Sequence, residues 1–132
     1  MKSGERQWQP VVLGGDVPAP VGAYSPGVRA GDFVFVSGQV PRDFRTGELI
    51  GDDVASQTRQ VVANLKTVLE ASGASLSDLV AITVYLADIG DWGQFNSTYK
   101  ELMSAPYPTR TAIGANLHGF LVEISGVAFV GK

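Results

Sequence analysis

The stretch Leu79-Val-Ala-Ile-Thr-Val-Tyr-Leu86 decides the fold, because it sets an extended segment between two helical patterns. Its density of β-branched residues is typical of a strand buried on both faces. Side chains that can share one helical face recur at spacings of three and four before and after it. The preceding set is Val54, Thr58, Val61, Val62, Leu65, Val68 and Leu69, and the following set is Trp92, Phe95, Tyr99, Leu102 and Met103. The pattern predicts a helix from about residue 53, a strand over 79–86 and a second helix over roughly 92–104.

Turn-forming residues mark the ends of these helices. Asp52 or Asp53 can cap the first helix, and Gly73 can end it. A second capped turn is expected at 75–78, just before the strand, and Pro106 follows the second helix.

Further strands are predicted around this centre. Residues 33–37, Phe-Val-Phe-Val-Ser, form a short β-branched and aromatic run, and residues 109–113 form another. Residues 120–130 are apolar on both faces, with even-numbered positions on one face and odd-numbered positions on the other. A turn over 43–47 leads to a possible short strand at 48–50.

This order of elements predicts an α+β fold. Strand–helix–strand units require crossovers, so the sheet is expected to be mixed, with both helices packed on one face. The opposite face then has no cover within one chain. Because both faces of the segment 120–130 carry apolar residues, self-association is the simplest way to cover it.

Length and composition exclude several classes of protein. The 132 residues suit a single domain, 1–132, with an irregular N-terminal segment over 1–15. The absence of Cys excludes a disulfide or a thiolate nucleophile, and a single His excludes a multi-histidine metal site. A net charge of −3 argues against broad electrostatic capture of nucleic acid. No apolar run reaches the roughly 18 residues that span a membrane, and the N-terminus lacks a signal-peptide core, so a cytoplasmic location is expected.

Arg110 and Glu123 are the principal candidates for chemistry. Arg110 lies in a predicted strand. Its planar guanidinium group can donate two parallel hydrogen bonds to a carboxylate ligand, although a surface or interface ion pair explains this residue as well. Glu123 interrupts an apolar strand, so it lies either at a solvated edge or in a partly buried site with a raised pKa, and a sheet-face acid paired with a Lys or Arg explains it as well. If their strands pair, the two side chains can approach one another, either as a structural ion pair or as a carboxylate clamp beside a general base.

The other polar candidates are less specific. Tyr24 lies in the stretch Gly22-Ala-Tyr-Ser-Pro26, and Ser37 and Gly38 lie in a turn after the first predicted strand. Gly38 permits close approach of a ligand, but a strand-ending turn explains it equally well. Asn96 projects from the second helix and is explained by capping, exposure or packing. His118, in a loop flanked by glycine, is interpreted as an exposed loop residue.

Eight short blocks also occur in order along the chain. They are Pro18-Ala-Pro-Val-Gly-Ala-Tyr-Ser25, Phe33-Val-Phe-Val-Ser-Gly-Gln-Val-Pro41, Thr46-Gly-Glu48, Gln57-Thr-Arg-Gln-Val-Val-Ala-Asn-Leu-Lys66, Val84-Tyr-Leu86, Phe95-Asn96, Pro108-Thr-Arg-Thr111 and Leu121-Val-Glu-Ile124. Each block is short, but the ordered set resembles the Rid/YjgF family of enamine/imine deaminases over nearly the whole chain.

The resemblance implies a chorismate-mutase-like fold and a homotrimer with clefts between subunits. It also implies hydrolysis of reactive enamines and imines, such as 2-aminoacrylate, to 2-keto acids and ammonia. Arg110 matches the family's clamp for the substrate carboxylate, and Glu123 matches the acid that positions or activates the attacking water. The other matched positions are substrate-binding residues of the cleft, namely Tyr24, Ser37, Gly38, Asn96 and Ala112. Because an α-imino acid is already electrophilic, orientation and proton management suffice, and no metal or organic cofactor is expected.

Two departures from the family pattern concern the cleft. Ala112 stands where many members have Cys or Thr, although the backbone is thought to act there. The loop 115–119 is about two residues shorter than in the best-known branch, so the cleft rim and the substrate preference are expected to differ. A trimer that binds 2-keto acids without turnover is the alternative function. An endoribonuclease or translation inhibitor is a third, which the acidic composition disfavours.

Overall fold

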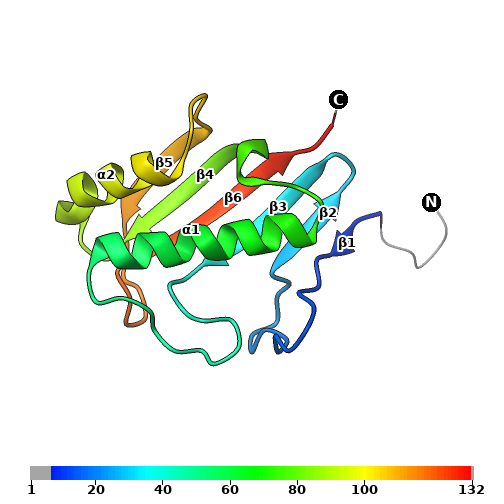
Figure 1. Ribbon diagram of the computed structural model, residues 1–132, viewed down its shortest axis with the longest axis horizontal. Coiled ribbons are helices and arrows are strands. Elements are labelled where there is room, and N and C mark those ends of the chain that lie inside the picture. The colour runs from blue at the N-terminus through cyan, green and yellow to red at the C-terminus, as the bar shows by residue number, and fades with distance from the viewer. Residues whose placement is uncertain (1–6, 132) are drawn as a thin grey trace.

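One mixed sheet carries two helices on the same face in the computed structural model, which describes residues 7–131 (Figure 1). The strands are β1 (Gln9–Pro10), β2 (Gly27–Ala30), β3 (Phe33–Gln39), β4 (Leu79–Leu86), β5 (Thr109–Gly114) and β6 (Val122–Phe129). The helices are α1 (Val54–Ala71) and α2 (Trp92–Leu102), and two short 3-10 turns are η1 (Leu76–Asp78) and η2 (Ile89–Asp91). The order of strands across the sheet is β1-β2-β3-β6-β4-β5.

The direction of the strands follows from the two helical connections. β4 and β5 run parallel, whereas the other neighbouring strands run antiparallel. The last strand, β6, lies between β3 and β4, so α1 connects two strands that are not neighbours and α2 connects two that are. The predicted α+β class, the mixed sheet and the helices on one face are confirmed. Neither helix of the described chain is long and apolar enough to cross a membrane.

The first helix begins and ends where the sequence predicts. The Asp53 carboxylate accepts the Ser56 N–H at 2.8 Å, and the Ser56 hydroxyl accepts the Asp53 N–H at 3.3 Å. This capping box satisfies N–H groups that the first turn leaves without partners. The hydrogen bonds from Ser56 also lower the pKa of Asp53. At the other end, Gly73 has a φ of 84°, the left-handed conformation that glycine adopts without strain.

The core lies between the helices and the sheet. Its fully buried side chains come from three strands and both helices, and include Val34, Val84, Leu86, Val122, Ile124, Val61, Leu65, Leu69 and Phe95. Along β6, buried residues alternate with more exposed ones, as the pattern over 120–130 predicts. Burying each large apolar side chain contributes about 1.5–3 kcal/mol. This layer therefore fixes the strands that carry the candidate residues.

The face of the sheet without helices is open and aromatic. Phe33, Phe35 and Phe129 are 42%, 47% and 38% exposed, respectively. The Phe33 ring centre lies 5.3 Å from that of Phe129 and 6.5 Å from that of Phe35. Both helices lie on the opposite side of the sheet (Figure 1). The expectation that a single chain leaves one apolar face without cover is therefore confirmed.

The N-terminal third contains two strands that the sequence did not predict. β2 pairs with β3, and β1 pairs with β2. The four residues of β2, Gly-Val-Arg-Ala, are too few to show an alternating pattern. β1 lies within the segment 1–15 that was expected to be irregular, and residues 1–6 of that segment lie outside the described chain.

The possible strand at 48–50 is not a strand. Leu49 makes only an isolated bridge with Arg42, which closes the turn predicted at 43–47. Within this turn the Asp43 carboxylate accepts the N–H groups of Arg45 at 2.8 Å and Thr46 at 3.0 Å. These local bonds compete with extended pairing and lower the pKa of Asp43.

Candidate functional site

Arg110 lies on β5, beside Ile82 of β4, on the face of the sheet that carries the helices. Its guanidinium carbon lies 5.1 Å from the centre of the Tyr99 ring, 5.6 Å from that of Trp92 and 5.9 Å from that of Phe95. A cation placed at such distances over an aromatic ring is attracted by the ring quadrupole. Its Nη1 also donates a hydrogen bond of 2.8 Å to Asn96 Oδ1. Because all four partners belong to α2, this one helix holds the guanidinium in place.

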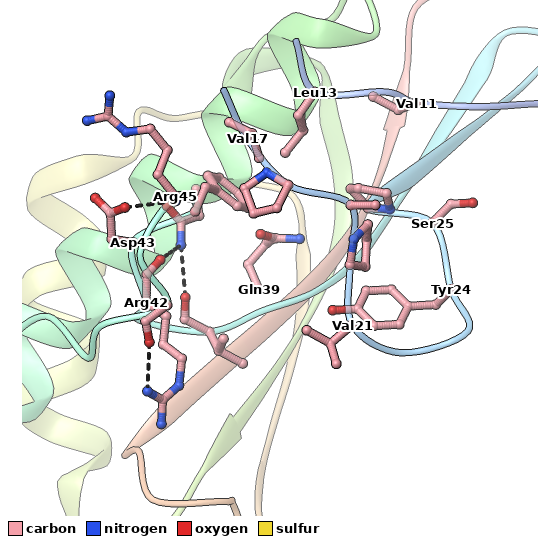
Figure 2. Close-up of a pocket in the computed structure, with 18 of the residues that line it drawn as sticks. Val11, Leu13, Val17, Val21, Tyr24, Ser25, Gln39, Arg42, Asp43 and Arg45 are labelled. Carbon is pink, nitrogen blue, oxygen red and sulfur yellow. Dashed lines mark hydrogen bonds between the residues drawn. The ribbon is translucent and has the colours of Figure 1, made fainter. Parts of the chain in front are cut away.

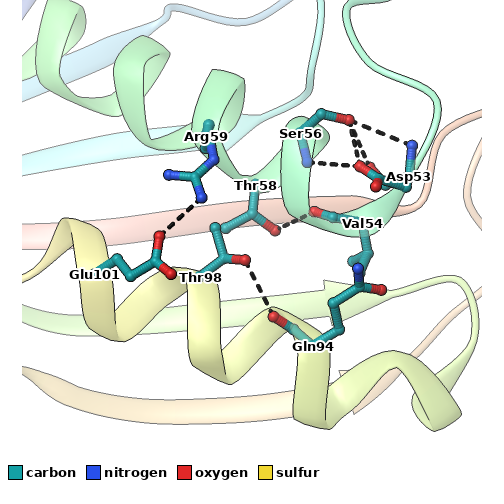
Figure 3. Close-up of polar contacts among 8 residues, drawn as sticks. All are labelled: Asp53, Val54, Ser56, Thr58, Arg59, Gln94, Thr98 and Glu101. Carbon is teal, nitrogen blue, oxygen red and sulfur yellow. Dashed lines mark hydrogen bonds and ion pairs between the residues drawn. The ribbon is translucent and has the colours of Figure 1, made fainter.

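Contacts with α1 fix the position of α2 (Figure 3). Arg59 of α1 forms an ion pair of 2.8 Å with Glu101 of α2. That pair is exposed, so it contributes at most about 1 kcal/mol. The buried hydroxyls of Thr58 and Thr98 donate to carbonyls one turn earlier in their own helices, at 2.6 Å and 3.2 Å. Both of these buried hydroxyls therefore have a hydrogen-bond partner, and Phe95 of α2 is fully buried.

A cavity of about 450 Å³ opens beside Arg110. Its lining residues are Asn96, Tyr99, Lys100, Tyr107, Pro108 and Arg110. No acidic residue is among them, and no Asp or Glu within residues 7–131 forms an ion pair with Arg110. The hydrogen bond to Asn96 uses one of the five N–H donors of a guanidinium. The remaining donors are therefore available to an anionic ligand.

Tyr99 has an unusual environment at the inner side of this cavity. Within the described chain, its hydroxyl is the buried side-chain polar atom that has no hydrogen-bond partner. Burial raises the pKa of Tyr99, and the nearby positive charge of Arg110 only partly opposes this effect. The phenol therefore stays protonated at neutral pH, and its ring packs against the guanidinium of Arg110.

Glu123 lies on β6, beside Tyr85 of β4, on the open face of the sheet. Its carboxylate lies directly against Gly38 of β3, where a Cβ atom would overlap it. Burial raises the pKa of Glu123, and the charge of His118 partly opposes this rise. No Lys or Arg within residues 7–131 forms an ion pair with this carboxylate. The structure therefore places Glu123 as a partly buried acid without a cationic partner in the described chain.

Ser37 connects β3 to the loop that carries Tyr24. Its hydroxyl donates to the Ser25 carbonyl at 2.6 Å, and its N–H donates to the Pro26 carbonyl at 3.0 Å. The Tyr24 side chain, in the same loop, is 60% exposed. His118 is exposed, as the sequence predicts.

The candidate residues form two groups on opposite faces of the sheet. Arg110 and the half-buried Ala112 lie on the helix side of β5, together with Asn96 of α2. Glu123 lies on the open face, with Gly38 against its carboxylate. Because β4 separates β5 from β6, the strands of Arg110 and Glu123 do not pair, and the expected approach of the two side chains does not occur within one chain. One chain by itself therefore does not bring both groups to one site.

A larger cavity, of about 690 Å³, lies between the N-terminal loop and the connection from β3 to α1 (Figure 2). The buried Gln39 projects between its walls, and its Nε2 donates to the Ser37 carbonyl at 3.0 Å. An exposed ion pair of 3.5 Å joins Asp16 to Arg45 across the two segments. Tyr24 and Gly38 also line it. Sequence reasoning missed this cavity, because both of its walls are loops without periodic patterns.

The side chains of the candidate site suit carboxylate binding and proton transfer. Among residues 7–131, no three His, Cys, Asp or Glu side chains gather as a metal site requires. The guanidinium of Arg110 can orient a carboxylate ligand. The Glu123 carboxyl, with its raised pKa, can accept or return a proton closer to neutral pH than an ordinary glutamate.

Comparisons with known proteins agree with this architecture. The family model described as endoribonuclease L-PSP matches residues 14–130. A RutC family protein of Pyrococcus horikoshii is 40% identical over 121 residues, which cover 90% of this chain and 96% of that protein. The 2-iminobutanoate/2-iminopropanoate deaminase of Rattus norvegicus is 36% identical over 123 residues, which cover 92% of this chain and 90% of the rat protein.

A similar fold occurs in solved structures. The crystal structure of E. coli TdcF with bound serine has a TM-score of 0.80 and 34% sequence identity to this chain. The superposition covers 88% of this chain and 94% of TdcF.

Proposed function

The chain belongs to the endoribonuclease L-PSP family, which includes the Rid/YjgF proteins, and we propose from this that it hydrolyses small 2-imino acids to 2-keto acids and ammonia. The observation that carries the proposal is the environment of Arg110. A guanidinium held by three rings and Asn96, without an acidic partner in the described chain, lines a cavity and is poised to bind a carboxylate. The name of the rat relative and the serine bound to TdcF support a small ligand with a carboxylate.

The proposed reaction consumes one water for each imine. Arg110 binds the substrate carboxylate through paired N–H donors, and a backbone group near Ala112 holds the nitrogen end. Water adds to the electrophilic imine carbon while the Glu123 carboxylate accepts its proton. Glu123 passes this proton to the imine nitrogen, which gives a neutral carbinolamine. A second proton then moves from the carbinolamine hydroxyl through Glu123 to the nitrogen, the C=O bond forms as the C–N bond breaks, and ammonia and the 2-keto acid leave. Glu123 returns to its starting state, so the protein needs no further reactant.

The proposed assembly is a homotrimer with clefts between subunits. Two features support it. Arg110 and Glu123 lie on opposite faces of one chain, so one copy has to contribute the clamp and the next copy the carboxylate. The open aromatic face that contains Phe33, Phe35 and Phe129 also needs cover. Tyr24, Ser37 and Gly38 would then line the cleft on the Glu123 side.

The direct test is the rate of imine hydrolysis. An amino-acid oxidase generates the imine of alanine in situ, semicarbazide competes for it, and lactate dehydrogenase reports the pyruvate formed. We expect the wild-type protein to outcompete semicarbazide. Arg110→Lys should lower kcat/KM by about 100-fold, because lysine keeps the charge but loses the fork that makes two charge-assisted hydrogen bonds of about 1.5–3 kcal/mol each.

The matched control is Arg59→Lys, at an exposed ion pair between the helices. It should leave kcat/KM within twofold of wild type. An Arg110→Lys protein as active as wild type would contradict the proposed clamp. Saturable binding of pyruvate with no acceleration of imine loss would instead support a binding protein.

A further inference from the structure

A second cation lines the Arg110 cavity, and we propose that this cavity accepts 2-imino and 2-keto acids that carry a second carboxylate. The second cation is Lys100, in the last turn of α2. The inference rests on the function proposed for this site and extends it to a class of substrate. Lys100 is assigned the role of a specificity-determining residue.

The positive charge of the cavity favours a ligand with two negative charges. The chain has a net charge of −3, yet this cavity is lined by two cations and no acid. Neither Arg110 nor Lys100 forms an ion pair within residues 7–131. A concave surface with two unneutralised charges of one sign attracts a dianion more strongly than a monoanion. A dicarboxylate is the simplest small ligand that satisfies both charges.

The two cations differ in how they are held. Three aromatic rings and Asn96 restrain the Arg110 guanidinium, which suits it to bind the invariant 1-carboxylate next to the reacting carbon. Lys100 is exposed, and its flexible stem allows the ammonium group to follow a carboxylate at the end of a four- or five-carbon chain. The restrained group therefore fixes the reacting end, and the mobile group selects the distal end.

The remaining lining groups fit such a ligand. The Tyr107 side chain is half exposed, and its hydroxyl can donate a hydrogen bond to a carboxylate. A volume of about 450 Å³ falls in the range of small-ligand pockets and exceeds what a three-carbon imino acid fills. Pro108 contributes an apolar wall for the methylene groups between the two carboxylates.

Lys100 also has a structural role that the test has to separate from binding. A cation in the last turn of a helix stabilises the carbonyl groups at that end. Lys100→Arg keeps this charge, whereas Lys100→Gln removes it. Lys66→Gln is the matched control, because it removes the same charge from an exposed position on α1.

The experiment compares two imines in each protein. D-Aspartate oxidase supplies the imine of D-glutamate, and D-amino-acid oxidase supplies the imine of D-alanine. The measured quantity is the ratio of kcat/KM for the dicarboxylic imine to that for the monocarboxylic imine. Lys100→Gln should lower this ratio about tenfold, equivalent to about 1.4 kcal/mol of lost interaction. Lys100→Arg and Lys66→Gln should keep it within threefold of wild type, and added salt should lower the wild-type ratio.

A binding measurement separates this inference from the proposed function. Isothermal titration calorimetry gives Kd values for 2-oxoglutarate and 2-oxobutanoate, which do not depend on turnover. Tighter binding of 2-oxoglutarate that is lost in Lys100→Gln supports the inference, even if neither imine is hydrolysed and the proposed activity fails. A ratio of kcat/KM values, or of Kd values, that Lys100→Gln leaves unchanged overturns the inference. Hydrolysis of the alanine imine in that same protein would leave the proposed function standing.

Discussion

Arg110 and Glu123 acquire their chemical properties from opposite kinds of surroundings. The guanidinium is held by aromatic rings and a neutral amide, so its charge is oriented but not neutralised. The carboxyl of Glu123 is partly buried against a glycine, and this burial raises its pKa. In the proposed reaction, these surroundings suit Arg110 to bind an anion and Glu123 to take part in proton transfer.

Glu123 should determine the acidic limb of the pH–rate profile. The proposed water activation requires the carboxylate form, so activity should fall as the pH drops through a pKa that lies above the ordinary 4.5. Glu123→Gln should lower kcat about 100-fold, in the range of general acid–base contributions, and should remove this limb. The measurement is kcat/KM from pH 4 to pH 9 for both proteins.

Thermal unfolding supplies the control for Glu123→Gln. A carboxyl whose folded-state pKa is raised favours folding most below its unfolded-state pKa, and this contribution is lost as the pH rises through the folded-state pKa. The variant should therefore melt no lower than wild type at pH 7. An unchanged acidic limb in Glu123→Gln would assign the titration to another group.

Tyr99→Phe should be neutral or stabilising. The hydroxyl that it removes is buried and has no hydrogen-bond partner in the described chain, so its loss removes a desolvated polar group. Tyr99→Ala should lower the free energy of unfolding by about 3–5 kcal/mol, because it empties a large buried site. Urea unfolding of the three proteins checks this. A loss of more than about 1 kcal/mol in Tyr99→Phe would show that the hydroxyl has a partner in the assembled protein.

At the scale of elements, Gly38 of β3 leaves the space that the Glu123 carboxylate of β6 occupies. A Cβ there would overlap the Glu123 carboxylate, which would have to move. Gly38→Ala should therefore lower kcat at least tenfold by misplacing Glu123, since small displacements of a catalytic group reduce rates strongly. The activity assay measures this change, and circular dichroism checks that the fold is retained.

Gly93→Ala is the matched glycine control. Gly93 lies in α2, where an added Cβ would meet nothing within 4 Å. Alanine is the better helix former, so this variant should gain about 0.5–1 kcal/mol of stability and keep wild-type activity. Full activity in Gly38→Ala would show that the Glu123 carboxylate tolerates displacement.

The central elements could be predicted from the sequence, because their patterns are long. The helix that begins after Asp53, the strand over 79–86 and the alternating faces of 120–130 each contain several repeats of their period. The strands β1 and β2 have two and four residues, too few to show a period. The segment 48–50 has the composition of a strand, but the bonds of Asp43 close the turn before it, and Leu49 makes only an isolated bridge.

The residues of the candidate site could be identified by type, but their positions could not. A charged residue within a predicted strand is visible in the sequence, and this pattern identifies Arg110 and Glu123 as candidates. Their positions depend on β4, which lies between their strands: Arg110 pairs with Ile82 and Glu123 with Tyr85, and these two residues of β4 point to opposite faces. The aromatic surroundings of Arg110 were also hidden, since Trp92, Phe95 and Tyr99 show only the spacing of a helix.

At the scale of the whole molecule, two observations point in the same direction. An open face with exposed Phe33, Phe35 and Phe129 requires cover, and the two candidate catalytic groups cannot meet within one chain. Self-association of the proposed kind would satisfy both requirements at once. Each chain would then carry two half-sites, and each site would be completed by a neighbouring copy.

Mixed assemblies of two inactive variants test this central claim most directly. Arg110→Ala and Glu123→Gln are co-expressed in equal amounts, and imine hydrolysis is compared with that of each variant alone. If every site takes Arg110 from one copy and Glu123 from another, random mixing gives an intact pair at about one quarter of sites, and about one quarter of wild-type activity should return. Activity no greater than that of the two parent variants would contradict the shared site.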